Sequence, residues 1–220
     1  MLDTAVPYQA TQLRSDPLDP RQSLDIPEQT QPRRSSYAGE DEQSHILADP
    51  IEYAPPVIVF FSFMNDRSKQ WAMEHQVVQN LRKSVPQGTT IARYHAPMRF
   101  AWDFGEHLTH AWAVAKSLQV DDRIIGPLFE AVHDRKIHDL EGVRAVFNEC
   151  GVPPDMFLKE WGKEWVMGEK KAMDDAVAHV DLDEVPGILV KGKYMVKLDA
   201  LKDSSADGVI KLVKGLLARE

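Results

Sequence analysis

Cysteine is nearly absent from this chain of 220 residues, because Cys150 is the only one. A single cysteine cannot close a disulfide within the chain, so the cysteine count does not indicate the redox compartment. Cys150 lies in the last turn of a predicted amphipathic helix. This setting is typical of a small apolar residue, with a resolving or intermolecular thiol as the alternative.

Long apolar runs are missing as well. No run approaches the ~20 residues that a membrane helix needs, so we predict no membrane span. Residues 1–10 have no basic start followed by an apolar stretch of about 7 to 15 residues, so we expect no secretory leader in the chain as written. The hydrophobic fraction of 43% is enough for the core of one domain of usual size.

Clustered basic residues are also scarce. The formal charge is -8, and the only basic pair near the start is Arg33 with Arg34. Sequence-independent binding of nucleic acid needs clustered Lys and Arg to neutralise phosphates, so we exclude nucleic acid as a partner.

Two pairs of side chains have helical spacing, which would place each pair on one face of a helix where it could contact a ligand. His107 and His110 are three residues apart, but a zinc site needs a third protein ligand, and we expect solvated surface histidines and no metal. Trp161 and Trp165 are four apart and could cover a partner, yet core packing is the expected role, as it is for Trp112.

Residues 1–52 are rich in Pro, Gln, Ser and Asp. Few large apolar residues recur there, so this segment cannot bury enough surface to offset its ordering entropy, and we predict a disordered, acidic tail. Its short apolar islands, Leu24–Ile26 and His45–Leu47, could dock on a partner or on the domain. A solvated tail with no partner is the alternative. The folded domain is predicted to span residues 53–220.

The domain opens with a strand, a helix and a second strand. The apolar run Val57–Phe63 predicts a buried strand, Asn65 or Asp66 supplies an N-cap, and one helix is expected to continue to Pro86. Thr89–His95 predicts the second strand. A unit of this length implies that the two strands are parallel.

A long helical stretch follows, which we place at about residues 98–180. The chain then returns to strands at Gly187–Val190 and Tyr194–Lys197, which flank a turn. The apolar residues from Val209 to Leu217 recur at i, i+3, i+4 and i+7, so a final amphipathic helix is predicted. The pattern is that of an α/β domain with an all-helical insertion.

Several motifs carry a resemblance to a known family: Phe60–Phe63 (FFSF), Leu108–Ala115 (LTHAWAVA) and Val185–Tyr194 (VPGILVKGKY). In order and spacing the chain closely resembles the DsbA family of periplasmic thiol:disulfide oxidoreductases, from about Pro56 to Leu217. The resemblance implies a thioredoxin-like fold with an all-helical insertion.

Three departures from the family decide which properties carry over. Asn65 and Ser68 stand where the family has the two cysteines of Cys-x-x-Cys, with Asp66 and Arg67 between them. Val59 stands where the best-known members place a buried acidic residue that assists proton transfer. Only a thiolate can exchange a disulfide, so we predict that the dithiol chemistry is lost.

Pro186 survives, and in the family it is a cis-proline that faces the helix start and helps to hold an extended substrate peptide. A cis bond after Val185 is physically plausible, since X-Pro bonds tolerate it. We therefore expect a peptide-binding site, with no catalytic residue and no metal. Its residues are Met64, Asn65, Asp66, Arg67, Ser68, Val185 and Pro186. The alternative is that Asn65–Ser68 only caps a helix.

The sequence thus predicts a redox-inactive DsbA-like protein that binds an extended peptide or a protein partner as an adaptor or chaperone-like module, with no cofactor. The alternative is a glutathione-dependent transferase or isomerase of the kappa-like type, in which Ser68 donates a hydrogen bond to a thiolate. A homologue without a selected activity is also open. We expect a cytoplasmic location, or a periplasmic one if a leader has been removed.

Overall fold

The computed structural model describes residues 37–40, 43–97, 102–135, 137–198 and 205–219. The strands form one mixed sheet in the spatial order β1-β2-β6-β5-β3-β4. Their bounds are β1 Tyr37–Glu40, β2 Ser44–Leu47, β3 Val57–Phe61, β4 Ile91–His95, β5 Gly187–Val190 and β6 Tyr194–Val196.

The central strand β3 is buried along its whole length. It pairs in parallel with β4 and antiparallel with β5, so Val59 lies between Arg93 and Ile188. Alternate β3 residues enter different apolar clusters: Ile58 and Phe60 face one side of the sheet and Val59 faces the other. Burial on both faces explains why β3 reads as an unbroken apolar run rather than as an alternation.

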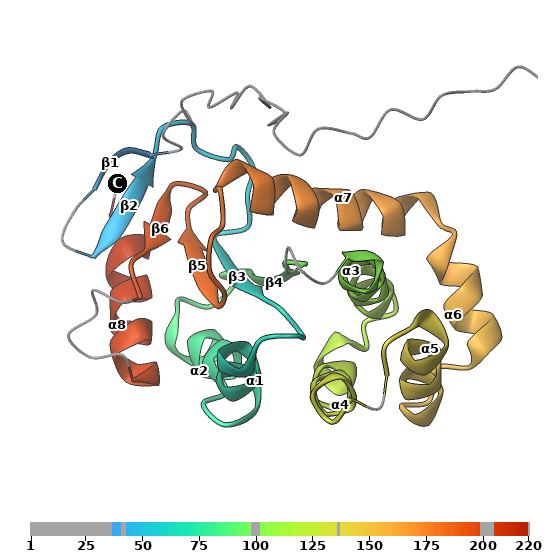
Figure 1. Ribbon diagram of the computed structural model, residues 1–220. Helices are drawn as coiled ribbons and strands as arrows, with labels where there is room; N and C mark the ends of the chain where they lie inside the picture. Colours follow the sequence, from blue (N-terminus) through green and yellow to red (C-terminus); the bar gives the residue numbers. More distant parts are fainter. Residues whose placement is uncertain (1–36, 41–42, 98–101, 136, 199–204, 220) are drawn as a thin grey trace, which may run out of the picture. The chain divides into compact units, whose positions relative to one another are not determined.

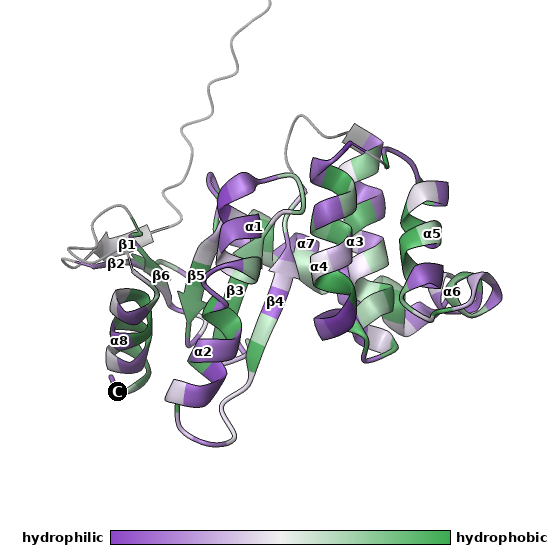
Figure 2. Cartoon of the chain, turned by 90° about the horizontal axis from the view of Figure 1, so that it is seen from below, coloured by the Kyte–Doolittle hydropathy of each residue, from purple (hydrophilic) through white to green (hydrophobic). Residues whose placement is uncertain are grey.

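Helices cover both faces of the sheet (Figure 1). One face packs against α1 Asp66–Met73, α2 Val77–Ser84 and α8 Ala206–Leu217. In Figure 2, α8 carries hydrophobic and hydrophilic residues along its length, as its amphipathic pattern predicted. The other face packs against the helices between β4 and β5: α3 Trp102–Ser117, α4 Asp121–His133, α5 Leu140–Glu149, α6 Pro154–Trp161 and α7 Glu164–His179.

The expected architecture is therefore confirmed: a thioredoxin-like α/β core with an all-helical insertion. Trp112 of α3 is fully buried at the centre of the insertion side, where its indole N–H donates to the carbonyl of Arg93 (3.0 Å). None of the helices in the described ranges is long and apolar enough to cross a membrane.

The single helix predicted up to Pro86 is wrong, because two helices are found. The α1 helix ends at Met73, and Gln76 adopts a left-handed conformation (φ 47°) immediately before α2 begins. The side-chain amide of Asn80 donates to the carbonyl of His75 (3.0 Å) and satisfies one main-chain group of the break. The break lets both Trp71 and Leu81 point into the same apolar cluster.

The predicted start of the domain at residue 53 also needs correction. Residues Ser44–Leu47, assigned to the tail, form β2 and pair antiparallel with β6, and Leu47 is buried in the core. This short segment gains its strand structure from the long-range pairing with β6, which local composition does not reveal. Residues 1–36 of the predicted tail lie outside the described residues.

Candidate functional site

The segment Asn65–Ser68, which stands in place of Cys-x-x-Cys, forms the capped start of α1. The chain leaves β3 at Phe61, turns through Ser62, and enters α1 with Asn65 as the N-cap residue in extended conformation. The Asn65 Oδ1 atom accepts a hydrogen bond from the N–H of Ser68 (2.8 Å). Asn65 therefore satisfies one of the helix's unpaired N–H groups, which is the usual function of such a residue at this place.

Ser68 points into the protein and is only 1% exposed. Its Oγ atom accepts a hydrogen bond from the N–H of Ser62 (3.2 Å), and the residue lines a small apolar cavity together with Val59, Trp71 and Pro186. A hydroxyl held in this way ties α1 to the end of β3. It does not meet a ligand arriving from solvent.

The loop from α7 to β5 delivers Pro186 to the helix start. After the C-cap residue Val180, the N–H of Asp181 donates to the carbonyl of Ala178 (3.2 Å) and the N–H of Leu182 donates to that of Val177 (3.2 Å). This pair of bonds is a Schellman motif, with Asp181 in the left-handed conformation (φ 46°) that glycine usually supplies. The motif ends α7 and directs residues 181–186 along the sheet.

The Val185–Pro186 peptide bond is cis, as the resemblance implies. Among the described residues, neither the N–H nor the carbonyl of Val185 has a hydrogen-bond partner. Gly187 follows where space is tight, since a Cβ there would lie 2.7 Å from the Cε of Met195. The main chain of Val185, a residue that is only 9% exposed, is thus unpaired beside a compact apolar surface.

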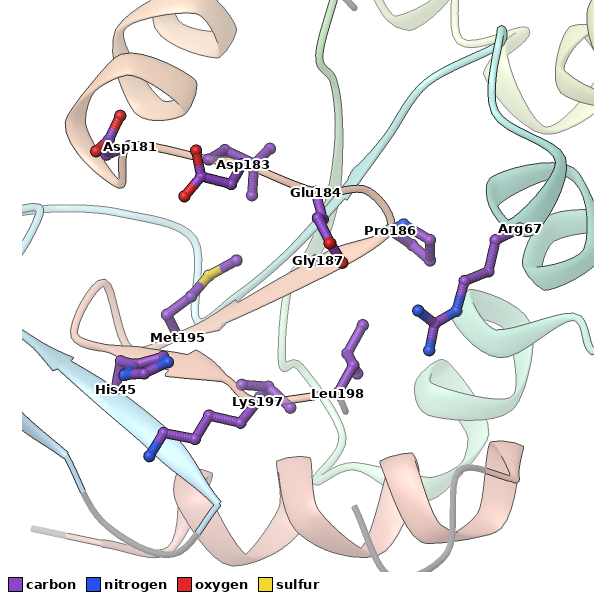
Figure 3. Close-up of a pocket in the computed structure, with 12 residues that line it drawn as sticks. His45, Arg67, Asp181, Asp183, Glu184, Pro186, Gly187, Met195, Lys197 and Leu198 are labelled. Carbon is purple, nitrogen blue, oxygen red and sulfur yellow. The ribbon is translucent and has the colours of Figure 1, made fainter. Parts of the chain in front are cut away.

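A groove of about 370 Å³ runs beside this loop (Figure 3). Arg67 from α1 and Pro186 lie at one end, so the structure brings the motif and the proline loop to the same groove. Met195 and Leu182 contribute apolar surface. The remaining lining residues are His45, Asp181, Asp183, Glu184, Gly187, Val196, Lys197 and Leu198.

A second hollow, of about 540 Å³, lies on the other side of the α1 start and is lined by Met64 and Asp66. The exposed carboxylate of Asp66 lies 3.0 Å from Nδ1 of His133, at the end of α4. The seven predicted site residues therefore divide among distinct places. Arg67 and Pro186 line the first groove with Val185 beside it, Met64 and Asp66 line the second hollow, Asn65 caps α1, and Ser68 lies beneath the helix.

A buried charge beside Val59 was missed by the sequence analysis. Arg93 on β4 is buried, and its Nη2 donates to Asp122 Oδ1 (2.6 Å) and to the carboxylate of Asp121 at the start of α4. Burial alone would raise the pKa of Asp122, but Arg93 and Arg82 outweigh it and hold this pKa below its usual value. The sequence signals that could have indicated this ion pair were an arginine within a predicted strand and two adjacent aspartates that begin 28 residues later.

His95, at the end of β4, was also missed. It is fully buried, and its Nδ1 lies 2.8 Å from the hydroxyl of Thr109, which itself donates to the carbonyl of Gly105 (3.2 Å). The hydroxyl must then accept from Nδ1–H, which leaves Nε2 as the unprotonated nitrogen, buried and without a partner among the described residues. Burial lowers the pKa of His95 to about 3.

Two expectations for the insertion are wrong. His110 is not a solvated surface residue: it is buried, its ring stacks on Trp161 (3.6 Å between centroids), and its Nε2 lies 2.9 Å from the Trp161 carbonyl. Burial lowers its pKa. Trp165 is 59% exposed rather than packed in the core, because its indole N–H donates to Ser117 Oγ at the surface (3.0 Å).

No group of three or more metal-ligating side chains occurs among the residues that the structure describes. Cys150 is the C-cap residue of α5 and packs, partly buried, against the core. Burial raises the pKa of its thiol, as expected of a small apolar residue rather than a reactive one.

No family model matches this chain. It is 35% identical over 179 residues to the thiol:disulfide interchange protein DsbA of Pectobacterium carotovorum, covering 79% of this chain and 86% of that protein. It is 33% identical over 169 residues to the DsbA of Salmonella typhimurium, covering 76% and 81%.

The fold is similar to solved DsbA structures. That of the Proteus mirabilis disulfide oxidoreductase matches with a TM-score of 0.76 at 29% identity, over 82% of this chain and 97% of that one. A structure of a cysteine-to-serine variant of that protein, with the non-covalently bound peptide PWATCDS, matches with a TM-score of 0.77 at 29% identity, over 82% of this chain and 98% of that one. The curated relatives are bacterial, and the chain belongs to the DsbA family of thiol:disulfide interchange proteins.

Proposed function

We propose that this chain is a redox-inactive member of the DsbA family that binds extended peptides or a partner protein as an adaptor or chaperone-like module. The observation that carries the proposal is the contrast within one site. The positions of both cysteines hold an N-cap residue and a buried hydroxyl, while the groove beside Pro186 remains open. No cysteine thiol stands at the α1 start for disulfide exchange.

The main chain of Val185 supports peptide binding in an extended conformation. Its N–H and carbonyl have no partner in the described part of the chain, so they can pair with a peptide as an added strand would. The cysteine-to-serine variant of the relative from Proteus mirabilis binds the heptapeptide PWATCDS without a covalent bond. We infer that the corresponding groove is the binding site here, with Arg67 and Pro186 at its end.

The structure gives no specific support to a glutathione-dependent enzyme. That alternative needs the Ser68 hydroxyl to reach a thiolate, and this hydroxyl is buried against the N–H of Ser62. Whether the chain acts in the cytoplasm remains a prediction. Membership of a family that the resemblance places in the periplasm favours the periplasmic alternative, and fractionation of native cells would decide between the two.

The proposal is tested with a labelled heptapeptide, PWATSDS, whose lack of sulfur excludes covalent capture. Fluorescence anisotropy should show saturable binding to the wild-type protein and to Val185→Thr, which keeps the main-chain N–H. Val185→Pro removes that donor, and the affinity should fall about fivefold or more. Equal binding by folded Val185→Pro, or no binding to the wild type, would contradict the proposal.

A further inference from the structure

The groove beside Pro186 has a wall of carboxylates on the loop between α7 and β5. The Schellman motif at the end of α7 sets the course of this loop, which places Asp181, Asp183 and Glu184 in the lining. Figure 3 shows the Asp183 and Glu184 side chains on the side of the loop that faces Met195. The wall therefore lies beside the apolar floor of the groove.

Two of these carboxylates are without ion pairs. Among the described residues, Asp183 and Glu184 make no hydrogen bond or ion pair, and both are exposed. The other charged or titratable lining groups are Arg67, Asp181, His45 and Lys197, and each of them already interacts with another group. The charge left for an incoming ligand along this wall is therefore negative.

We propose that the groove selects extended peptides that carry Lys or Arg beside an apolar residue, a preference that rests on the proposed peptide-binding function. An apolar side chain of the peptide would pack on Met195 and Leu182, while a neighbouring cationic side chain would meet Asp183 or Glu184. Met suits such contacts because its flexible thioether adapts to different side chains. The chain's net charge of -8 would also speed the approach of a cationic peptide.

The positions of the charged groups in the groove determine where a cationic side chain of the peptide can lie. Arg67 lies at the Pro186 end of the groove and offers no attraction to a cation, whereas Asp183 and Glu184 on the neighbouring loop do. The cationic side chain is therefore expected away from the α1 start. Each such exposed pair adds little by itself, about 1.4-fold to 5-fold in affinity, and two pairs together give a measurable preference.

The test uses three labelled peptides of the form Ala-X-Trp-X-Val-X-Ala, in which X is Lys, Gln or Glu. Wild-type protein should bind the Lys peptide about fivefold or more tightly than the Glu peptide, with the Gln peptide between them. Asp183→Asn with Glu184→Gln should abolish most of this preference. Asp155→Asn with Glu149→Gln removes the same two charges from exposed positions on α6 and α5, and the preference should persist.

The two levels of the proposal fail differently. If the Gln peptide binds and all three affinities are equal, the charge preference is overturned while the peptide-binding function stands. If the control double variant loses the preference as fully as the groove variant, the attraction comes from net charge and the groove assignment is wrong. If none of the peptides binds, the peptide-binding function itself is contradicted.

Discussion

Acid should destabilise this protein through one buried imidazole. His95 has no exposed surface, and its Nδ1 is hydrogen-bonded to Thr109. Its Nε2 is buried and has no partner in the described structure, so a proton added there would find no acceptor. Its pKa is about 3 in the folded state, against an ordinary value of 6.5. Between these two values the unfolded chain binds a proton that the native state does not, so the free energy of unfolding falls as the pH drops from 6.5 toward 3.

The magnitude follows from this difference in pKa. Relative to pH 8, His95 alone should lower the free energy of unfolding by about 2 kcal/mol at pH 5 and about 3 kcal/mol at pH 4. Below pH 3 both states are protonated, and the contribution levels off. A loss of this size is a large part of the stability of a typical domain.

Urea unfolding at pH 8, 5 and 4 provides the assay, with His95→Asn as the test variant. Asn can still donate to Thr109 but does not titrate, so this variant should be less stable at pH 8, because it leaves a cavity, yet lose about 2 kcal/mol less than wild type between pH 8 and 5. The exposed His75→Gln is the control and should retain the wild-type dependence. Parallel pH curves for wild type and His95→Asn would refute the reasoning.

Three further changes probe the α1 start and the charge beneath it. Asn65→Ala should lower the free energy of unfolding, measured in urea, by about 1 kcal/mol. Asn65→Asp should lower it much less, because only Asp retains an acceptor for the N–H of Ser68, and equal losses would show that the cap does not stabilise α1. Arg93→Met should lower the free energy of unfolding by about 3 kcal/mol, against less than about 1 kcal/mol for Arg82→Met at a half-exposed position. Similar losses would show that the burial of Arg93 adds nothing to its pairing with Asp121 and Asp122. Asn65→Cys with Ser68→Cys should introduce weak catalysis of insulin reduction by dithiothreitol, and a folded but inactive double variant would show that the helix start no longer presents two thiols competently.

Much of the fold was predictable because its patterns are local. The apolar run of β3 and the stripe of α8 each follow the period of their secondary structure, and both were located correctly. The N-cap at Asn65 was likewise one of two predicted positions. These features depend on residues that are neighbours in the sequence.

The rest depends on contacts between distant residues. Strand β2 is defined by its pairing with β6, about 150 residues away, and its own sequence is short and half polar. Arg93 is neutralised from the start of α4, and His110 is buried by the stacked ring of Trp161, so neither environment is visible from the flanking sequence. Tertiary context overrides local pattern in each of these cases.

The central claim is that the groove beside Pro186 binds peptide although the redox site is gone. Its most direct test is to titrate the ¹⁵N-labelled full chain with PWATSDS and with the Lys peptide and to follow the amide chemical shifts. The account predicts saturable shifts at Arg67, Val185 and Gly187, around the groove, and no comparable shift at the exposed indole of Trp165. Shifts confined to the Trp165 surface, or no shifts with either peptide, would contradict it.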